Sequence, residues 1–291
     1  MIPAPFDYHA AGSLAEAVRL LERYGDEAKV LAGGQSLLPL LKLRLGQAAH
    51  LVDISRIPGL EYIKEEGGFL KIGAATREAA LERSDLVRAR YPILLDTAAV
   101  IADPLVRNRA TVGGNLAHGD PANDHPATML ALGAQVVAQG PKGARTIPIE
   151  KFFTGLFTTA LAATEILTEI RIPIPPPRSG GAYVKLERKV GDFATAAAAA
   201  QVTLGTKGEV ERAGIGLTNA GPNPIKATEA EQYLRGKAPD EATIAAAALL
   251  AARVTAPRAD RRGSVDYKRE MARVLTARAL RKAAQRAGGQ S

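Results

Sequence analysis

Cysteine and tryptophan are absent from the 291-residue chain. Without cysteine there is no disulfide, no thiolate zinc site, no cysteine nucleophile and no thiolate ligand for an iron–sulfur cluster. Long apolar runs are missing too: the longest, residues 244–252, is short and mostly alanine, whereas a membrane-spanning helix needs about 20 residues. The first residues also lack the basic segment and the apolar core of a signal peptide. We therefore expect a cytoplasmic protein, at most peripheral at the inner face of the cell membrane.

An excess of one charge is also missing from most of the chain. The net charge is +8, but residues 251–291 alone contain eleven Lys and Arg against three Asp and Glu, so the other residues balance. Few aromatic side chains are interleaved with these basic residues, so no nucleic-acid partner is expected. A solvated helix face with arginine stems over apolar surface is the favoured interpretation, and an acidic partner surface is the alternative.

What is present is an ordinary globular composition, 46% hydrophobic and 23% charged, which predicts a full core. The proline-rich segment 173–177, followed by Arg-Ser-Gly-Gly, is the best domain boundary. We predict an α+β protein with one domain over residues 1–176, in subdomains of about 1–56 and 57–176, and a second over 177–291. The second domain is expected to hold a three-stranded antiparallel sheet (182–188, 195–204 and 210–218) carrying helices at 227–234, 240–254 and 265–287.

Two turns with paired glycines stand apart: Ala32-Gly33-Gly34-Gln35-Ser36 and Thr111-Val112-Gly113-Gly114-Asn115. Paired glycines permit positive φ and a close backbone approach, so consecutive N–H groups can converge on an anion. Ser36, Thr111 and Asn115 add short side-chain donors. Neither turn has dinucleotide-fingerprint spacing or the lysine of a phosphate-binding loop. Each turn alone is most simply structural, but two together suggest opposite sides of one diphosphate.

The residues after the second turn add two histidines and two carboxylates. Asp124 either caps the helix that begins near His125, which is the favoured interpretation, or accepts hydrogen bonds from ribose hydroxyls. No second cluster of ligands supports a metal site around His118 and His125. Serine-hydrolase and zinc-protease motifs are absent from the sequence. Lys185 follows the linker and, as a charged strand residue, is most simply solvent-facing.

Four stretches together carry a resemblance over nearly the whole chain: AGGQSLLPLLKLRL (32–45), IADPLVRNRATVGGNLAHGDPANDHPA (101–127), FFTGLFTTAL with EILTEIRIP (152–173), and KLERKVGDFATAAAA (185–199). With these motifs the chain resembles the FAD-binding medium subunits of molybdenum hydroxylases, the xanthine dehydrogenase family, and most of all its carbon monoxide dehydrogenase branch. The resemblance implies an FAD-binding domain of the vanillyl-alcohol-oxidase type in two subdomains, followed by the flavoprotein C-terminal domain of that branch.

The resemblance also implies site residues. The flavin diphosphate would lie between the two turns, which gives that role to Ala32, Gly33, Gly34, Gln35, Ser36, Leu37, Thr111, Gly113, Gly114 and Asn115. Asp124 matches the position that binds flavin hydroxyls, and Ile101, Leu161, Lys185 and Phe193 match flavin-lining positions. Two residues depart from relatives, which often have histidine at Gln35 and have tyrosine at Phe193. The backbone contacts survive the first change, and the second removes a hydroxyl beside the isoalloxazine ring.

The activity implied by the resemblance is electron transfer, in which the cofactor supplies the redox chemistry and the protein orients it. FAD would be the only cofactor on this chain, with no catalytic residue and no metal. A large subunit would hold molybdopterin and a small subunit the iron–sulfur clusters, in a dimer of heterotrimers. Electrons would leave to a quinone, NAD or oxygen. A flavin-free scaffold subunit and a free-standing FAD oxidase of the same fold remain alternatives.

Overall fold

The N-terminal unit is a small parallel sheet with helices, in the computed structural model that describes residues 1–289. Its strands run β1 (Asp7–Ala10), β3 (His50–Asp53) and β2 (Ala28–Leu31) across the sheet. Helix α1 (Leu14–Tyr24) begins at Ser13, whose Oγ accepts from the Glu16 N–H, and ends at Gly25 with φ +53°. The sequence predicted both ends. Helix α2 (Leu37–Lys42) follows the first glycine turn directly.

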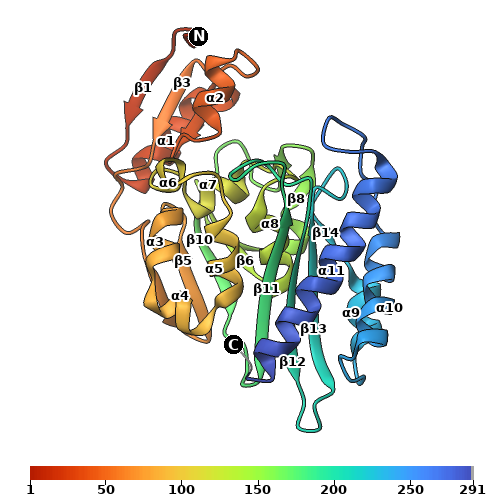
Figure 1. Ribbon diagram of the computed structural model, residues 1–291. Helices are drawn as coiled ribbons and strands as arrows, with labels where there is room; N and C mark the ends of the chain where they lie inside the picture. The colour runs from red at the N-terminus through yellow and green to blue at the C-terminus, as the bar shows by residue number, and fades with distance from the viewer. Residues whose placement is uncertain (290–291) are drawn as a thin grey trace.

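The second unit is a five-stranded antiparallel sheet with short helices (Figure 1). The strand order is β4 (Ile63–Glu66), β5 (Phe69–Gly73), β10 (Ile166–Pro173), β6 (Gln135–Gly140) and β7 (Gly143–Pro148). The helices are α3 (Glu78–Arg83), α4 (Asp85–Arg90), α5 (Pro92–Ala99), α6 (Pro104–Arg107), α7 (Val112–Ala117) and α8 (Asp124–Leu132). A short hairpin, β8 (Phe153–Gly155) and β9 (Thr158–Thr159), lies beside it. The second glycine turn is thus the start of a helical segment rather than an isolated turn.

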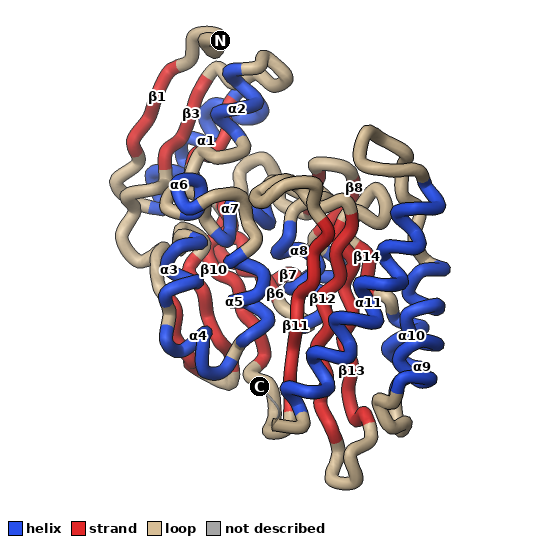
Figure 2. Tube along the Cα trace, in the orientation of Figure 1, coloured by secondary structure: helices blue, strands red, loops and turns tan. Residues whose placement is uncertain are grey.

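The third unit contains the three long strands expected from the sequence, β11 (Ser179–Leu186), β12 (Ala196–Leu204) and β13 (Val210–Thr218), all antiparallel. A two-residue strand, β14 (Ile225–Lys226), extends the sheet. Helices α9 (Thr228–Leu234), α10 (Glu241–Arg253) and α11 (Val265–Ala287) follow, and α11 crosses the outer face of β11 and β12 (Figures 1 and 2). Helix α11 is long, but none of the helices among residues 1–289 is both long and apolar enough to cross a membrane.

The alanine run of β12 explains how the second and third units join. Ala197 and Ala199 belong to the core shared with α5 and α8, whereas Ala196, Ala198 and Ala200 belong to the core beneath α9 to α11. Successive strand residues face opposite sides, so both faces of this sheet are covered by helices. Small side chains allow these close contacts. Helices α5 and α8 therefore lie between two sheets, and the beginning of α8 is enclosed by both units.

The basic C-terminal residues are mostly engaged within the chain. Seven of the eleven Lys and Arg counted there form ion pairs: Arg262, Lys268, Arg269, Arg273, Arg281, Lys282 and Arg286. Two of these pairs join α11 to the second unit, because Lys282 and Arg286 both donate to the carboxylate of Asp96 on α5. The structure thus assigns much of this charge to surface and interdomain pairs.

Candidate functional site

The fold brings the two glycine turns together. A Cβ on Gly33 would lie 2.8 Å from the Arg109 carbonyl carbon, and closer still to its oxygen. Only glycine therefore permits this approach of the two backbones. A narrow cavity lies between the turns and is lined by Ala32, Gly33, Ser55, Ala75, Arg77, Arg109 and Thr111. Residues almost 80 positions apart in sequence thus form one site.

The first turn presents free backbone donors. Within residues 1–289 the N–H groups of residues 33–37 make no hydrogen bond, although the Leu38 N–H already donates to the Gly34 carbonyl at 3.1 Å. Gly34 has φ +75°, in the left-handed region, and this conformation turns the chain from β2 into α2. Consecutive free N–H groups in such a turn form an anion-binding concavity. The first turn therefore has the donors that a diphosphate requires.

The second turn contributes side chains rather than backbone donors. The N–H groups of Val112 and Gly113 donate to the Thr76 and Ala74 carbonyls in the turn after β5, and that of Gly114 donates to Thr111 Oγ1 at 3.2 Å. Within residues 1–289 only the first of the two turns therefore leaves consecutive N–H groups free to face an anion. Among the residues that the structure describes, however, the Asn115 Oδ1 atom is buried without a partner. An orphaned buried acceptor is costly, which indicates a missing partner at this position.

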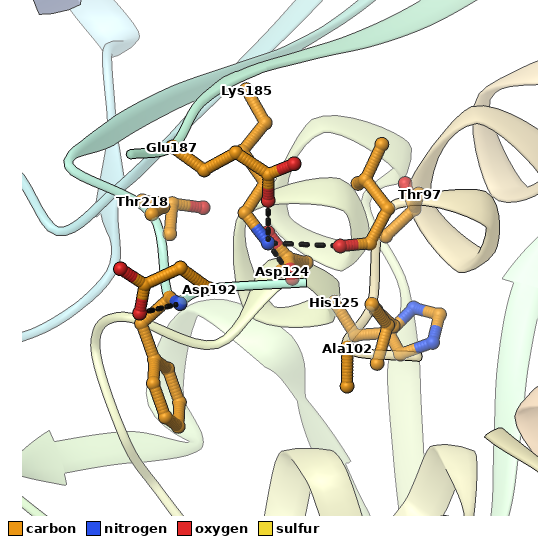
Figure 3. A network of polar contacts seen from close by, with 12 residues as sticks. Thr97, Ala102, Asp124, His125, Lys185, Glu187, Asp192 and Thr218 are labelled. Atoms are coloured by element: carbon orange, nitrogen blue, oxygen red, sulfur yellow. Dashed lines mark hydrogen bonds and ion pairs between the residues drawn. The ribbon is translucent and has the colours of Figure 1, made fainter. Parts of the chain in front are cut away.

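Asp124 lies at the centre of a buried network that joins the second and third units (Figure 3). Its Oδ1 accepts from the Tyr183 hydroxyl at 2.6 Å and its Oδ2 from Lys185 Nζ at 3.0 Å. The capping interpretation of Asp124 is wrong, because the N-cap of α8 is Asn123 and no side chain caps this helix. Tyr183 and Lys185 reach Asp124 from β11 because α8 packs on β12 and β13 of the same sheet, a tertiary contact that overrides local capping preference.

Burial shapes the electrostatics of this network. It raises the pKa of Asp124, while the Lys185 ammonium and the Tyr183 hydroxyl act in the opposite direction. Burial and the neighbouring carboxylate raise the pKa of Tyr183 well above its ordinary value, so this hydroxyl stays protonated and donates. The side chain of Lys185 is only 2% exposed, so the interpretation of Lys185 as a solvent-facing strand residue is also wrong. The carboxylate retains lone pairs for further donors.

Lys185 connects Asp124 to other predicted residues. Its ammonium also donates to the Val100 carbonyl at 2.9 Å, directly before Ile101, and lies 3.4 Å from Glu187 Oε2. The structure thus brings Asp124, Lys185 and the segment of Ile101 together. Leu161 follows β9 and is partly buried against the central core, without a direct bond to this network. Phe193 lies in the loop after β11 and is 49% exposed.

Some residues of the site were not anticipated from the sequence. Tyr183 is one, and the period-two alternation of β11 places it on the same face as Lys185, so strand register is the signal that identifies it. Asn123 is another, because its Nδ2 donates to the Asn115 carbonyl at 2.8 Å and ties the second turn to α8. Arg109 and Ser55 line the cavity between the turns. No local motif marks these residues.

Together these groups fit a flavin dinucleotide. The free N–H groups of the first turn suit a diphosphate, and the buried Asn115 oxygen and the spare lone pairs of Asp124 suit hydroxyl donors. Among residues 1–289 no three His, Asp or Glu side chains are grouped so as to hold a metal ion. These donors and acceptors are of the kind that a nucleotide cofactor requires.

Comparison with known proteins identifies the family. The family model described as the FAD binding domain in molybdopterin dehydrogenase matches residues 4–175, and that of the CO dehydrogenase flavoprotein C-terminal domain matches residues 181–283. The chain is 47% identical to the carbon monoxide dehydrogenase medium chain of Afipia carboxidovorans, over 99% of both chains. It is 41% identical to the 6-hydroxypseudooxynicotine dehydrogenase complex subunit alpha of Paenarthrobacter nicotinovorans, over 99% of this chain and 97% of that one.

A solved structure agrees with these relatives. The carbon monoxide dehydrogenase of Hydrogenophaga pseudoflava that lacks the Mo-pyranopterin moiety of its cofactor contains a chain that superposes with a TM-score of 0.96. That chain is 48% identical, and the match covers 98% of this chain and 99% of that one. The resemblance inferred from the sequence motifs and the expected fold class are therefore confirmed. The chain belongs to the family of FAD-binding medium subunits of the molybdenum hydroxylases.

Proposed function

We propose that FAD binds across the two glycine turns, with its diphosphate on the backbone donors of residues 33–37. The observation that carries this assignment is the run of N–H groups in the first turn that no other part of residues 1–289 uses. Ala32, Gly33, Gly34, Gln35, Ser36 and Leu37 form this side of the cradle, and Thr111, Gly113, Gly114 and Asn115 form the other. The close approach at Gly33 keeps both sides within reach of one ligand.

Asp124 accepts hydrogen bonds from flavin hydroxyls in this proposal, and Ile101, Leu161, Lys185 and Phe193 line the ring system. Lys185 and Tyr183 hold the Asp124 carboxylate in one orientation from β11, so acceptor positions are fixed before the ligand arrives. Bound FAD supplies the electron-carrying chemistry. The phenyl ring of Phe193 shields apolar ring surface but offers no hydroxyl.

The chain is the flavoprotein subunit of a molybdenum hydroxylase and acts within a complex. We propose that its partners are a large molybdopterin subunit and a small iron–sulfur subunit, in a dimer of heterotrimers located in the cytoplasm. The sequence has no cysteine, so thiolate-bound clusters must come from a partner. The final acceptor is a quinone, NAD or oxygen. Relatives over 40% identical carry names with different substrates, which suits a chain that does not hold the substrate pocket.

The test is the flavin spectrum of the purified complex, read with and without the partner subunits. The proposal predicts stoichiometric FAD in the complex and flavin reduction by a hydroxylase substrate only when the partners are present. A complex that assembles without flavin identifies a scaffold subunit. Turnover of a small substrate by the isolated chain identifies a free-standing oxidase. Either outcome overturns the proposal.

A further inference from the structure

The loop after β11 carries Phe193 and rests on the FAD-binding domain. Gly191 in this loop has φ +82°, and a Cβ there would lie 2.8 Å from the Ala102 carbonyl oxygen. Ala102 directly follows Ile101, one of the proposed flavin-lining residues. The loop thus touches this segment through backbone atoms at Gly191. Phe193 lies only two residues further on, so the position of the loop determines where Phe193 lies. Phe193 itself is half exposed, so the packing of its own side chain does not hold the loop.

Asp192 is the residue that anchors the loop. Its carboxylate is 10% exposed and accepts from Arg188 Nε at 3.1 Å, from Arg262 Nη2 at 2.8 Å and from the Phe193 N–H at 2.9 Å. Arg188 lies in the same loop, so the bond from Arg262 is the contact that comes from another part of the chain. The same bond is the largest cause that lowers the pKa of Asp192 to about 2. Asp192 is therefore ionised at neutral pH.

Arg262 approaches Asp192 from a stiffened segment between α10 and α11. Its own N–H donates to Asp260 Oδ1 at 2.7 Å. The buried Lys268 on α11 donates to Asp260 Oδ2 at 2.8 Å and to the Arg258 carbonyl at 2.9 Å. These bonds fix the backbone from which the Arg262 side chain extends. Arg262 Nε is buried without a partner in residues 1–289, so the bond from Nη2 to Asp192 is the contact that holds the guanidinium in place.

We propose that Arg262 is a positioning residue, whose ion pair with Asp192 holds the loop of residues 187–193, and with it Phe193, against the FAD site. The assignment rests on the proposed function for its link to FAD. The ion pair itself does not depend on the cofactor. The second domain would thereby set how closely the aromatic ring covers the flavin, although it contributes no contact to the diphosphate cradle.

Hydrogen exchange of the full chain, measured by mass spectrometry over residues 187–195, tests whether the Arg262–Asp192 ion pair holds the loop, and it needs no cofactor. The perturbed protein is Arg262→Ala, and Arg262→Lys is the conservative rescue. Arg261→Ala is the matched control, because this neighbouring arginine is exposed and its removal changes the net charge equally. Loss of a charge-assisted bond predicts about tenfold or faster exchange in the loop for Arg262→Ala. The control should match the wild type, and the lysine variant should recover most of the protection.

A second readout links the loop to the flavin. In the reconstituted complex, Arg262→Ala should release FAD several-fold faster and raise the quenching of flavin fluorescence by iodide, while Arg261→Ala changes neither. The double variant of Arg262→Ala and Asp192→Ala should release FAD little faster than Arg262→Ala alone, because both changes break the same ion pair. An unchanged hydrogen-exchange rate in the loop of a normally folded Arg262→Ala protein would overturn the proposal that this ion pair holds the loop. A complex without FAD that still shows the exchange difference would instead refute the proposed function and leave the loop contact intact.

Discussion

Substitution of Gly33 gives the sharpest test of the proposed diphosphate site between the two turns. The change to alanine adds one methyl group. This methyl group would lie 2.8 Å from the carbonyl carbon of Arg109 and 2.9 Å from the Cα of Ala110. Backbone atoms cannot rotate away as a side chain can, so the two turns must separate. Overpacking of this kind costs about 1–3 kcal/mol.

The cost should appear in FAD binding more than in folding. Without the ligand, the turns relieve the overlap by moving apart, and only part of the strain remains in the folded protein. In the proposed site both turns contact the same FAD diphosphate, so FAD binding must bring the turns back together and restore the strain. A cost of about 1–3 kcal/mol corresponds to an affinity roughly 5- to 150-fold lower.

The assay is FAD affinity by equilibrium dialysis of the reconstituted complex, with the melting temperature measured in parallel. Gly46→Ala is the matched control, because a Cβ there meets only the Leu40 side chain at 3.9 Å. The control should bind FAD as the wild type does. Wild-type FAD affinity in a folded Gly33→Ala complex would refute the argument that this contact holds the two sides of the cradle.

Three carboxylates in ion pairs, Asp124, Asp192 and Asp96, provide further tests. Asp124→Ala should weaken FAD binding by about 1–3 kcal/mol, and calorimetry should show a free energy of unfolding lower by up to about 3 kcal/mol, because the buried Lys185 ammonium loses Asp124 and keeps only the Val100 carbonyl and Glu187; unchanged FAD affinity would contradict the proposed flavin contact. The pKa of Asp192 is lowered from 3.8 to about 2, so its stabilisation is complete above pH ~4 and is lost as the pH falls towards 2; urea titrations between these values should show a shallower pH dependence for Asp192→Asn. Asp96→Ala removes the acceptor of Lys282, Arg286 and the Tyr183 N–H and should lower the melting temperature, and an unchanged melting temperature would argue against this interdomain contact.

Local signals were enough to find the turns and most long elements. Ser13 and Gly25 marked both ends of α1, and the glycine pairs marked the segments that the fold brings together. These features depend on backbone chemistry within a few residues, which a sequence displays directly. The short strand β14 lacked such a signal, because two residues paired to β13 form no recognisable pattern.

The centre of the site could not be predicted from local chemistry. Asp124 has the sequence context of a helix cap, and only the packing of α8 on the sheet that contains β11 brings Tyr183 and Lys185 to its carboxylate. The partners lie about 60 residues away, so neither spacing nor propensity reveals them. The family resemblance marked Asp124 and Lys185 as flavin positions, but it did not reveal that they bond to one another. The ion pair of Asp192 with Arg262 is equally non-local.

We infer that this chain holds FAD for partner subunits that supply the electrons. The most direct measurement is the flavin absorbance of the purified complex, followed anaerobically as a hydroxylase substrate is added to the complex and to the isolated chain. We expect stoichiometric FAD that bleaches in the complex and stays oxidised when the chain is alone. A complex without flavin absorbance, or bleaching of the isolated chain by substrate, would contradict it.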